Sequence, residues 1–206
     1  MNTVLMNGIV YGLEELEKDS WIRLLNGSLS YKHAMHNPVV ANMHQQGVNM
    51  RTVVLRKAWP AEKKLAFHTD IRSGKWTELE QQKNISWLFY DAAGKIQIRL
   101  SGEASLHHKD TIADESWLAS TMNSRKIYLG EKGPSQLSEL AVSGLPAVFE
   151  QRDPTNEESI PGRKNFGVVV TDVHWMEWLW LNSGGHRRAT FTYNEDKTFT
   201  AGWLIP

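Results

Sequence analysis

The sequence predicts a mainly β fold of the antiparallel barrel type, with peripheral helices. Seven or eight apolar, β-branched runs follow one another and are joined mostly by short turns rich in Gly, Asn and Asp. Strands and helices do not alternate regularly, as they would in a doubly wound sheet, and no segment repeats. A chain of 206 residues can bury one sizeable core, so we expect a single domain over residues 1–206.

The first half of the chain is expected to contain two helices and two hairpins. The run GLEELEKDSWIRLL has apolar residues at helical spacing, and the following glycine is a typical helix end. The run KIQIRLSGEASL alternates apolar and polar residues strictly, as a half-buried strand does. The expected elements are a helix over 12–25 that ends at Gly27, strands over 38–43, 48–57, 65–69, 85–90 and 95–106, and a helix over 75–82.

The second half is expected to begin with helices and to return to strands. Asp110 is a candidate N-cap for a helix that runs to about Met122, and a shorter helix is expected over 134–142. The polar stretch over 151–164, which contains two prolines, reads as a surface loop. Four strand-like runs follow, over 166–173, 174–182, 186–193 and 198–206.

The charge balance and the lack of cysteine narrow the possible functions. Lys plus Arg and Asp plus Glu both number 23, so the formal net charge is zero. No overall field therefore draws the chain to nucleic acid or to an anionic membrane, and any anion site must be local. The absence of cysteine excludes disulfides and thiol chemistry. Since neither a signal peptide nor an apolar run of ~18 residues is visible, we expect a cytoplasmic protein without membrane contact.

The stretch HTDIRSGKW places positive charge where a strand gives way to a helix. Arg72 and Lys75 flank the expected helix start, where a cation is unfavourable by up to ~1 kcal/mol unless an anion lies between it and the free backbone N–H groups. Thr69 and Ser73 add hydroxyl groups, and Gly74 permits close approach of the backbone. These residues describe a phosphate cradle. A solvated basic loop is the alternative.

Two of the expected strands carry polar side chains that could bind a ligand. Arg51 and Arg56 lie in the apolar run RTVVLRK, where strand alternation would place them on opposite faces. Each either contacts a ligand or pairs with a surface carboxylate. Gln97 lies on the polar face of its strand, beside Arg99, where its carboxamide can both donate and accept toward a heterocycle. A side chain that faces water is the alternative for Gln97.

The run HWMEWLWLN is apolar on both faces of its strand. Such a strand has a core on one side and either a subunit interface, a planar ligand or more core on the other. The eight histidines include no HExxH motif and no third ligand at a telling distance, so no metal site is expected. Hydrolase and nucleoside-triphosphatase motifs are also absent from the sequence.

The order of these motifs resembles one family. RTVVLRK, LAFHTDIRSGKWTEL, ISWLFY, KIQIRLSGEA and a late HRR with a terminal WLIP are together similar to the pyridoxamine 5′-phosphate oxidase-related proteins. The resemblance covers nearly the whole chain. It implies an antiparallel Greek-key split β-barrel that binds FMN, and a homodimer with two FMN sites at the subunit interface.

The resemblance also implies roles for individual residues. Arg51 is expected near the FMN phosphate, Arg56 near the ring, and Lys75 on the phosphate. Trp178 is expected to match the late tryptophan of the family, with Trp180 as the alternative. Together with the cradle, the implied FMN contacts are Arg51, Thr52, Val53, Val54, Leu55, Arg56, His68, Thr69, Arg72, Ser73, Lys75, Gln97, Ser135, Trp178 and Arg188.

Departures from the family pattern concern the substrate. The oxidases that act on pyridoxamine phosphate carry RLHDR near the end, but this chain reads HRRATF, so the histidine is missing and only Arg187 corresponds. We therefore expect an FMN-dependent oxidoreductase that acts on an unidentified small substrate, with Arg56, Arg187 and Arg188 as candidate contacts for an anionic substrate. The alternatives are a flavin carrier or sensor without turnover, a true pyridoxamine 5′-phosphate oxidase, and a haem-binding split barrel.

Overall fold

A computed structural model of the chain describes residues 2–45 and 47–206. They form two compact units. Unit 1 consists of Met1–Phe67, Lys83–Ser105 and Val170–Pro206, and unit 2 of His68–Gln82 and Leu106–Val169. Because each unit is assembled from separate segments, the chain does not divide into two consecutive domains. The single domain expected over 1–206 stays a prediction.

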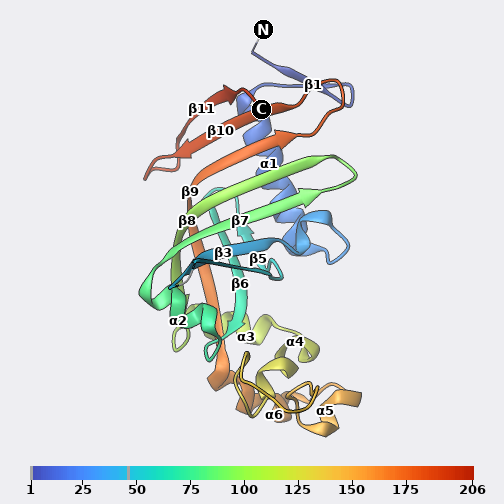
Figure 1. The fold of residues 1–206 in the computed structure, drawn as a ribbon, viewed down its shortest axis with the longest axis vertical. Coiled ribbons are helices and arrows are strands. Elements are labelled where there is room, and N and C mark those ends of the chain that lie inside the picture. Colours follow the sequence, from blue (N-terminus) through green and yellow to red (C-terminus); the bar gives the residue numbers. More distant parts are fainter. Residues whose placement is uncertain (1, 46) are drawn as a thin grey trace. The chain divides into compact units, whose positions relative to one another are not determined.

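An antiparallel sheet dominates unit 1. Its strand order is β11-β10-β9-β8-β7-β3-β4, with β5 and β6 off this path, and each of these neighbours with a described register is antiparallel (Figure 1). This confirms the predicted mainly β class. The strands are β1 Val4–Met6, β2 Ile9–Tyr11, β3 Val39–His44, β4 Gly47–Thr52, β5 Lys57–Trp59, β6 Lys64–Asp70, β7 Asn84–Asp91, β8 Ile96–His107, β9 Phe166–Trp180, β10 Arg187–Tyr193 and β11 Phe199–Leu204.

The two faces of this sheet differ in burial. Val40, Trp87 and Leu100 are direct partners across β3, β7 and β8, and each is at most 1% exposed. We call their side the inner face. Side chains one residue along each strand point the other way, as the period of two requires. On this outer face Leu88 is 39% and Met50 70% exposed. The predicted alternation in β8 is thereby confirmed.

Helix α1, Leu13–Leu29, extends beyond the predicted end at Gly27. Gly27 is buried within the helix, and a Cβ there would lie 2.7 Å from the Cβ of Met35 in the short helix η1, Ala34–His36. The glycine is therefore needed for close helix packing and does not terminate the helix. Sequence alone could not distinguish a glycine that ends a helix from one that permits close packing, because the contact with Met35 forms only in the folded chain.

The expected strand over 48–57 is interrupted. β4 ends at Thr52 and β5 begins at Lys57. Between them, Val53 N–H donates to Pro38 O at 2.9 Å and Leu55 N–H to His36 O at 2.9 Å. The alternation that placed Arg51 and Arg56 on opposite faces therefore does not continue to Arg56. The turn before β4 includes Gln46, which lies outside the described residues.

The helices of unit 2 differ from the predictions at several points. Asp110 caps α3 as expected, accepting from Ala113 N–H, but α3 ends at Ala119 and not near Met122. The helix predicted over 134–142 is wrong, since that stretch is irregular. The loop predicted over 151–164 is largely helical. The helices of the unit are α2 Gly74–Gln81, α3 Thr111–Ala119, α4 Met122–Lys126, α5 Ala147–Gln151 and α6 Asn156–Ser159, with short 3₁₀ turns η2 Ile127–Leu129 and η3 Ile160–Asn165.

The remaining differences concern strands. The predicted runs 166–173 and 174–182 form one continuous strand, β9, whereas β10 and β11 agree with the prediction. The small sheet of β1 and β2 was not predicted. Among the described residues, no helix has the length and apolar character needed to cross a membrane.

Candidate functional site

A lysine and two hydroxyl groups meet at the start of α2 in unit 2. Lys75 Nζ donates to Thr69 Oγ1 at 2.9 Å, and Thr69 Oγ1 lies 3.2 Å from Ser73 Oγ. Thr69 and Ser73 are nearly fully buried. We call these three residues the hydroxyl–lysine cluster. The sequence predicted their meeting, because the strand β6 ends and the helix α2 begins within this stretch.

The N-terminus of α2 suits an anion. Ser73 is the N-cap, yet its side chain makes no capping hydrogen bond, and the first turn contains no acidic residue. The first backbone N–H groups of a helix lack partners within the helix, and their partial positive charge attracts anions. A Cβ on Gly74 would meet only Glu78 Oε1, at 3.6 Å, so this position also leaves room for an approaching group.

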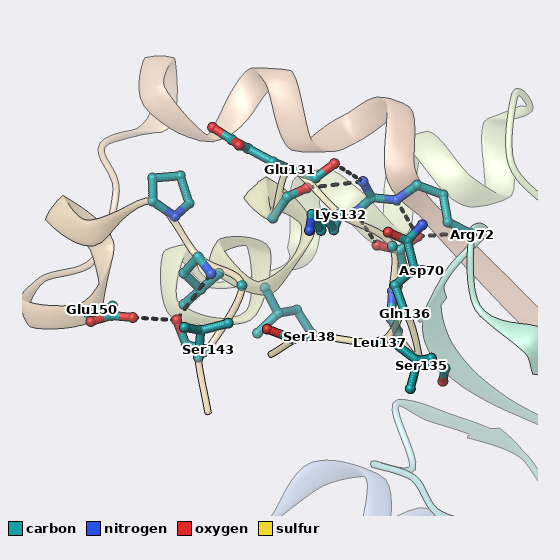
Figure 2. Close-up of a pocket in the computed structure, with 18 of the residues that line it drawn as sticks. Asp70, Arg72, Glu131, Lys132, Ser135, Gln136, Leu137, Ser138, Ser143 and Glu150 are labelled. Atoms are coloured by element: carbon teal, nitrogen blue, oxygen red, sulfur yellow. Dashed lines mark hydrogen bonds and ion pairs between the residues drawn. The ribbon is translucent and has the colours of Figure 1, made fainter. Parts of the chain in front are cut away.

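Arg72 forms hydrogen bonds with a carboxylate and with two backbone carbonyl groups, and its expected role in the cradle stays a prediction. Its Nε and Nη2 donate to the two carboxylate oxygens of Asp70 at 3.0 and 2.7 Å, and Nη1 donates to Gly130 O and Glu131 O (Figure 2). The hydrogen bonds that Arg72 donates to the Asp70 carboxylate raise the pKa of Arg72. Asp70 therefore neutralises the charge of Arg72 at the start of the helix.

A cavity of about 640 Å³ adjoins this ion pair within unit 2. Arg72 and Asp70 lie at one side of it, and the irregular segment 130–146 forms much of its wall (Figure 2). Ser135 lies on this wall, exposed, with φ of 70°. Its expected contact with FMN stays a prediction.

Arg51 lies on the inner face of unit 1. It is the direct partner of Val40 in β3, and its Nη1 donates to Asn42 Oδ1 and, at 3.2 Å, to Asn49 O. In the segment that follows, Thr52 is exposed and Leu55 is fully buried. Val53, Val54 and Arg56 are half-buried, and Arg56 N–H donates to Ala66 O at 2.8 Å. The structure thus holds this segment through its backbone.

The outer face of unit 1 carries two arginines that share one carboxylate. Arg99 Nη1 lies 3.3 Å from Glu177 Oε1, and Arg188 Nη2 lies 2.5 Å from Glu177 Oε2. The Glu177 side chain is 4% exposed, whereas those of Arg99 and Arg188 are 49% and 30% exposed. The Arg99 guanidinium lies over the ring of Trp175, 5.5 Å from its centroid. Gln97 is half-buried on the same face, two residues from Arg99.

The other late-strand candidates differ in how exposed they are. Trp178 is 0% exposed and belongs to the core, so Trp180, which is half-buried, is the better placed of the two tryptophans for a ligand. Arg187 is exposed and donates to Gly185 O and His186 O in the turn before β10.

In unit 2, the ring of His68 packs edge-on against Phe166, with centroids 4.8 Å apart.

A comparison with protein-family models identifies the domain. Residues 18–108 match the model described as the pyridoxamine 5′-phosphate oxidase FMN-binding domain. These residues are therefore similar to that FMN-binding domain. The match includes the hydroxyl–lysine cluster, the segment 51–56 and Gln97, and the cofactor of the family is FMN. No curated protein sequence matches the chain significantly.

Solved structures share the fold of this FMN-binding domain. A pyridoxamine 5′-phosphate oxidase-related, FMN binding protein from Nostoc punctiforme is 21% identical with a TM-score of 0.72, over 92% of this chain and 97% of its own. PhzG from Burkholderia lata, in complex with tetrahydrophenazine-1-carboxylic acid, is 14% identical with a TM-score of 0.65, over 94% and 90%. A protein from Clostridium acetobutylicum related to general stress protein 26 has a TM-score of 0.52 at 13% identity, over 88% and 95%. The predicted fold class, that of the FMN-binding split barrels, is confirmed.

The donor set of the hydroxyl–lysine cluster fits the phosphate of FMN. An ammonium group, two hydroxyls and a helix N-terminus without acidic neighbours are the groups that bind phosphate in proteins. The described residues hold no group of three or more His, Asp or Glu side chains arranged for a metal ion.

Sequence reasoning missed two carboxylates that organise these sites. Asp70 binds Arg72, and Glu177 joins Arg99 to Arg188. A signal for Glu177 was present, because an acidic residue inside the apolar run HWMEWLWLN needs a cationic partner when buried. For Asp70, the signal was its position two residues before an arginine that sits unfavourably at a helix start.

Proposed function

We propose that the protein is an FMN-dependent oxidoreductase that acts on a small substrate. One observation carries the proposal: Thr69, Ser73 and Lys75 meet at the N-terminus of α2, within the segment that matches the FMN-binding family. When bound, FMN supplies the transfer of hydride or single electrons. No side chain of the protein then needs to act as an acid or a base.

The chain's own residues anchor and orient the cofactor in this proposal. Lys75 provides charge to the phosphate, and Thr69 and Ser73 donate through their hydroxyls. Lys75 donates to Thr69, so the donors are gathered at one place. Gathered donors lower the ordering cost of binding. Gln97 and Arg56 are the proposed ring contacts, as the family resemblance implies.

The register of the sheet supports a homodimer. Arg51 is aligned with Val40, Trp87 and Leu100 on the inner face, whereas Gln97 lies on the outer face. Three strand spacings, about 14 Å, separate their strands in the order β8-β7-β3-β4. A single FMN is therefore poorly placed to contact both side chains of one chain. We propose that each FMN receives Arg51 from one chain and Gln97 from the other.

The substrate is proposed to differ from pyridoxamine phosphate. The family's RLHDR segment is replaced by HRRATF, and Arg187 donates to carbonyl groups of its own turn. Release of pyridoxal phosphate from pyridoxamine phosphate under air, at a useful rate, would overturn this part of the proposal. PhzG, which shares the fold, was solved in complex with tetrahydrophenazine-1-carboxylic acid, and this supports small organic acids as a first class to screen.

Turnover separates an oxidoreductase from a flavin carrier or sensor. The FMN-loaded protein is mixed with reduced nicotinamide without oxygen, and its visible flavin band is followed before and after air is admitted. We expect bleaching, reoxidation and repeated cycles. A band that bleaches with neither NADH nor NADPH would favour the carrier, which keeps the phosphate anchor without access to the ring.

A further inference from the structure

The outer face of unit 1 carries one positive charge more than its ion pairs require. Glu177 is the only carboxylate, among the described residues, that pairs with Arg99 and with Arg188. One arginine suffices to neutralise a buried carboxylate. Two guanidinium groups around one carboxylate leave a net charge of plus one on a face where Arg99 remains half exposed.

Stabilisation of the fold does not account for the second arginine. An ion pair with an exposed partner contributes little, about 0 to 1 kcal/mol, because water screens it. In addition, Arg188 Nε is buried and has no hydrogen-bond partner among the described residues. A buried donor without a partner is destabilising. The excess charge is explained if a ligand anion completes the arrangement.

The geometry points to a planar organic anion. Glu177 accepts from one nitrogen of each guanidinium, so it fixes both groups, while the side chain of Arg99 stays 49% exposed to an approaching ligand. Guanidinium groups match a carboxylate with paired hydrogen bonds. Trp175, over which Arg99 lies, offers an aromatic surface beside the charge. The net charge of plus one is balanced by a carboxylate, which carries a single negative charge.

We propose that Arg99 and Arg188, held by Glu177 and flanked by Trp175, form the recognition site for the carboxylate of a small aromatic substrate. The inference rests on the proposed function, because Gln97, the proposed ring contact, shares this face two residues from Arg99. The proposal makes Arg99 a substrate-binding residue and assigns Arg188 to the substrate in place of the cofactor.

Calorimetric titration tests the site, with benzoate as the probe and benzamide as its neutral analogue. The full chain is titrated with and without saturating FMN. We expect benzoate to bind, benzamide to bind at least tenfold more weakly, and Arg99→Gln to weaken benzoate binding roughly tenfold or more. Arg99→Lys keeps the charge but not the planar fork, so it recovers only part of the affinity.

Two controls keep the result interpretable. Arg152→Gln breaks another exposed arginine–carboxylate pair, with Glu158 in unit 2, and should leave benzoate binding unchanged. Arg99→Gln leaves Glu177 its bond to Arg188, so the variant should fold, as its melting temperature will report. Equal binding of benzoate and benzamide, or no effect of Arg99→Gln, overturns the site. Phenyl phosphate that binds more than tenfold tighter than benzoate overturns the carboxylate assignment.

The affinity for FMN distinguishes this inference from the proposed function. Arg99→Gln should leave FMN affinity within about threefold of wild type, because the variant keeps the proposed phosphate anchor and the proposed ring contact Gln97 unchanged. If FMN affinity falls as much as benzoate affinity, Arg99 belongs to the cofactor site and the inference fails while the proposed function survives. If the wild type binds benzoate through Arg99 but never binds FMN, the proposed function fails and the anion site stands.

Discussion

Lys75 supplies the formal positive charge of the hydroxyl–lysine cluster, and its removal should weaken FMN binding. Hydrogen bonds to charged groups contribute ~1.5–3 kcal/mol, so Lys75→Ala should raise the dissociation constant of FMN roughly tenfold to a hundredfold. The measurement is quenching of FMN fluorescence at equilibrium. Lys83→Ala, which removes a lysine that is 63% exposed and pairs with Glu103, is the matched control. Equal affinities of the two variants would remove Lys75 from the phosphate site.

Ser73 should matter for the ligand more than for the helix. Its hydroxyl does not cap α2, so Ser73→Ala should cost well under the ~1 kcal/mol of a typical N-cap while it lowers FMN affinity. Thr155 does cap α6, accepting from Glu158 N–H at 3.2 Å, so Thr155→Ala should cost about 1 kcal/mol without affecting FMN. Urea unfolding and FMN titration of both variants check this. A larger stability loss for Ser73→Ala than for Thr155→Ala would contradict it.

Single residues show where sequence reasoning succeeds and where it stops. The meeting of Thr69, Ser73 and Lys75 was predictable, because local spacing across one strand–helix junction determines it. The position of Arg72 was not, because its partners Gly130 and Glu131 lie far along the chain. The burial of Trp178 could not be predicted from the sequence either, since both faces of its strand are apolar.

Helix α1 offers a test of close packing. Replacement of a helical glycine by alanine normally stabilises a protein by ~1 kcal/mol. At Gly27 the added methyl group would overlap Met35, so Gly27→Ala should instead destabilise by about 1–3 kcal/mol. Asn26→Ala, at the exposed neighbouring position, should be neutral or stabilising. A Gly27→Ala protein that is more stable than wild type in urea would show that α1 and η1 do not pack this closely.

Helix α6 begins with a capping box that should be visible in a pH titration. The hydrogen bond from Arg152, aided by Thr155 N–H, lowers the pKa of Glu158 to about 2. A depressed carboxyl pKa stabilises the fold above the unfolded pKa of ~4.3, and this contribution is lost as the pH falls toward 2. Carboxyl NMR should show Glu158 titrating near pH 2 and nearer its ordinary range in Arg152→Gln. Titration near 4.3 in the wild type would mean that the Arg152–Glu158 pair is not formed.

The elements that were predicted wrongly share a physical reason. The stretch 151–164 contains Pro154, Pro161 and Gly162, which favour a loop, but Pro161 occupies an early position of η3 where its missing N–H is tolerated. The helix expected over 134–142 has apolar residues at helical spacing, yet Leu137 is 98% and Leu140 74% exposed, so no packing supports a helix there. In both stretches the structure depends on tertiary packing, which the local sequence does not reveal.

At the level of the whole molecule, a mixing experiment tests the homodimer. If each FMN contacts Arg51 of one chain and Gln97 of the other, Arg51→Ala and Gln97→Ala proteins should each bind FMN weakly, whereas a heterodimer of the two regains one intact site. The variants are unfolded together, refolded as a mixture and titrated with FMN. Recovery of tight binding in a fraction of the sites is the expected result. A mixture no better than either variant would place both residues in one chain's site.

The mainly antiparallel β class and the order of the family motifs were predictable from the sequence, because strand alternation and short turns are local signals. The division into two compact units was not, since it depends on which segments meet after folding. The substrate also cannot be inferred from the sequence motifs, because the segment HRRATF departs from the family pattern at the positions that would bind the substrate.

The central claim is that the protein binds FMN through the phosphate, at the hydroxyl–lysine cluster. Its most direct test compares equilibrium binding of FMN with that of riboflavin, which has the same ring system and no phosphate. We predict tight binding of one FMN per chain and binding of riboflavin at least tenfold weaker, as the loss of charge-assisted hydrogen bonds requires. Equal affinities for the two flavins, or no binding of FMN, would contradict the account.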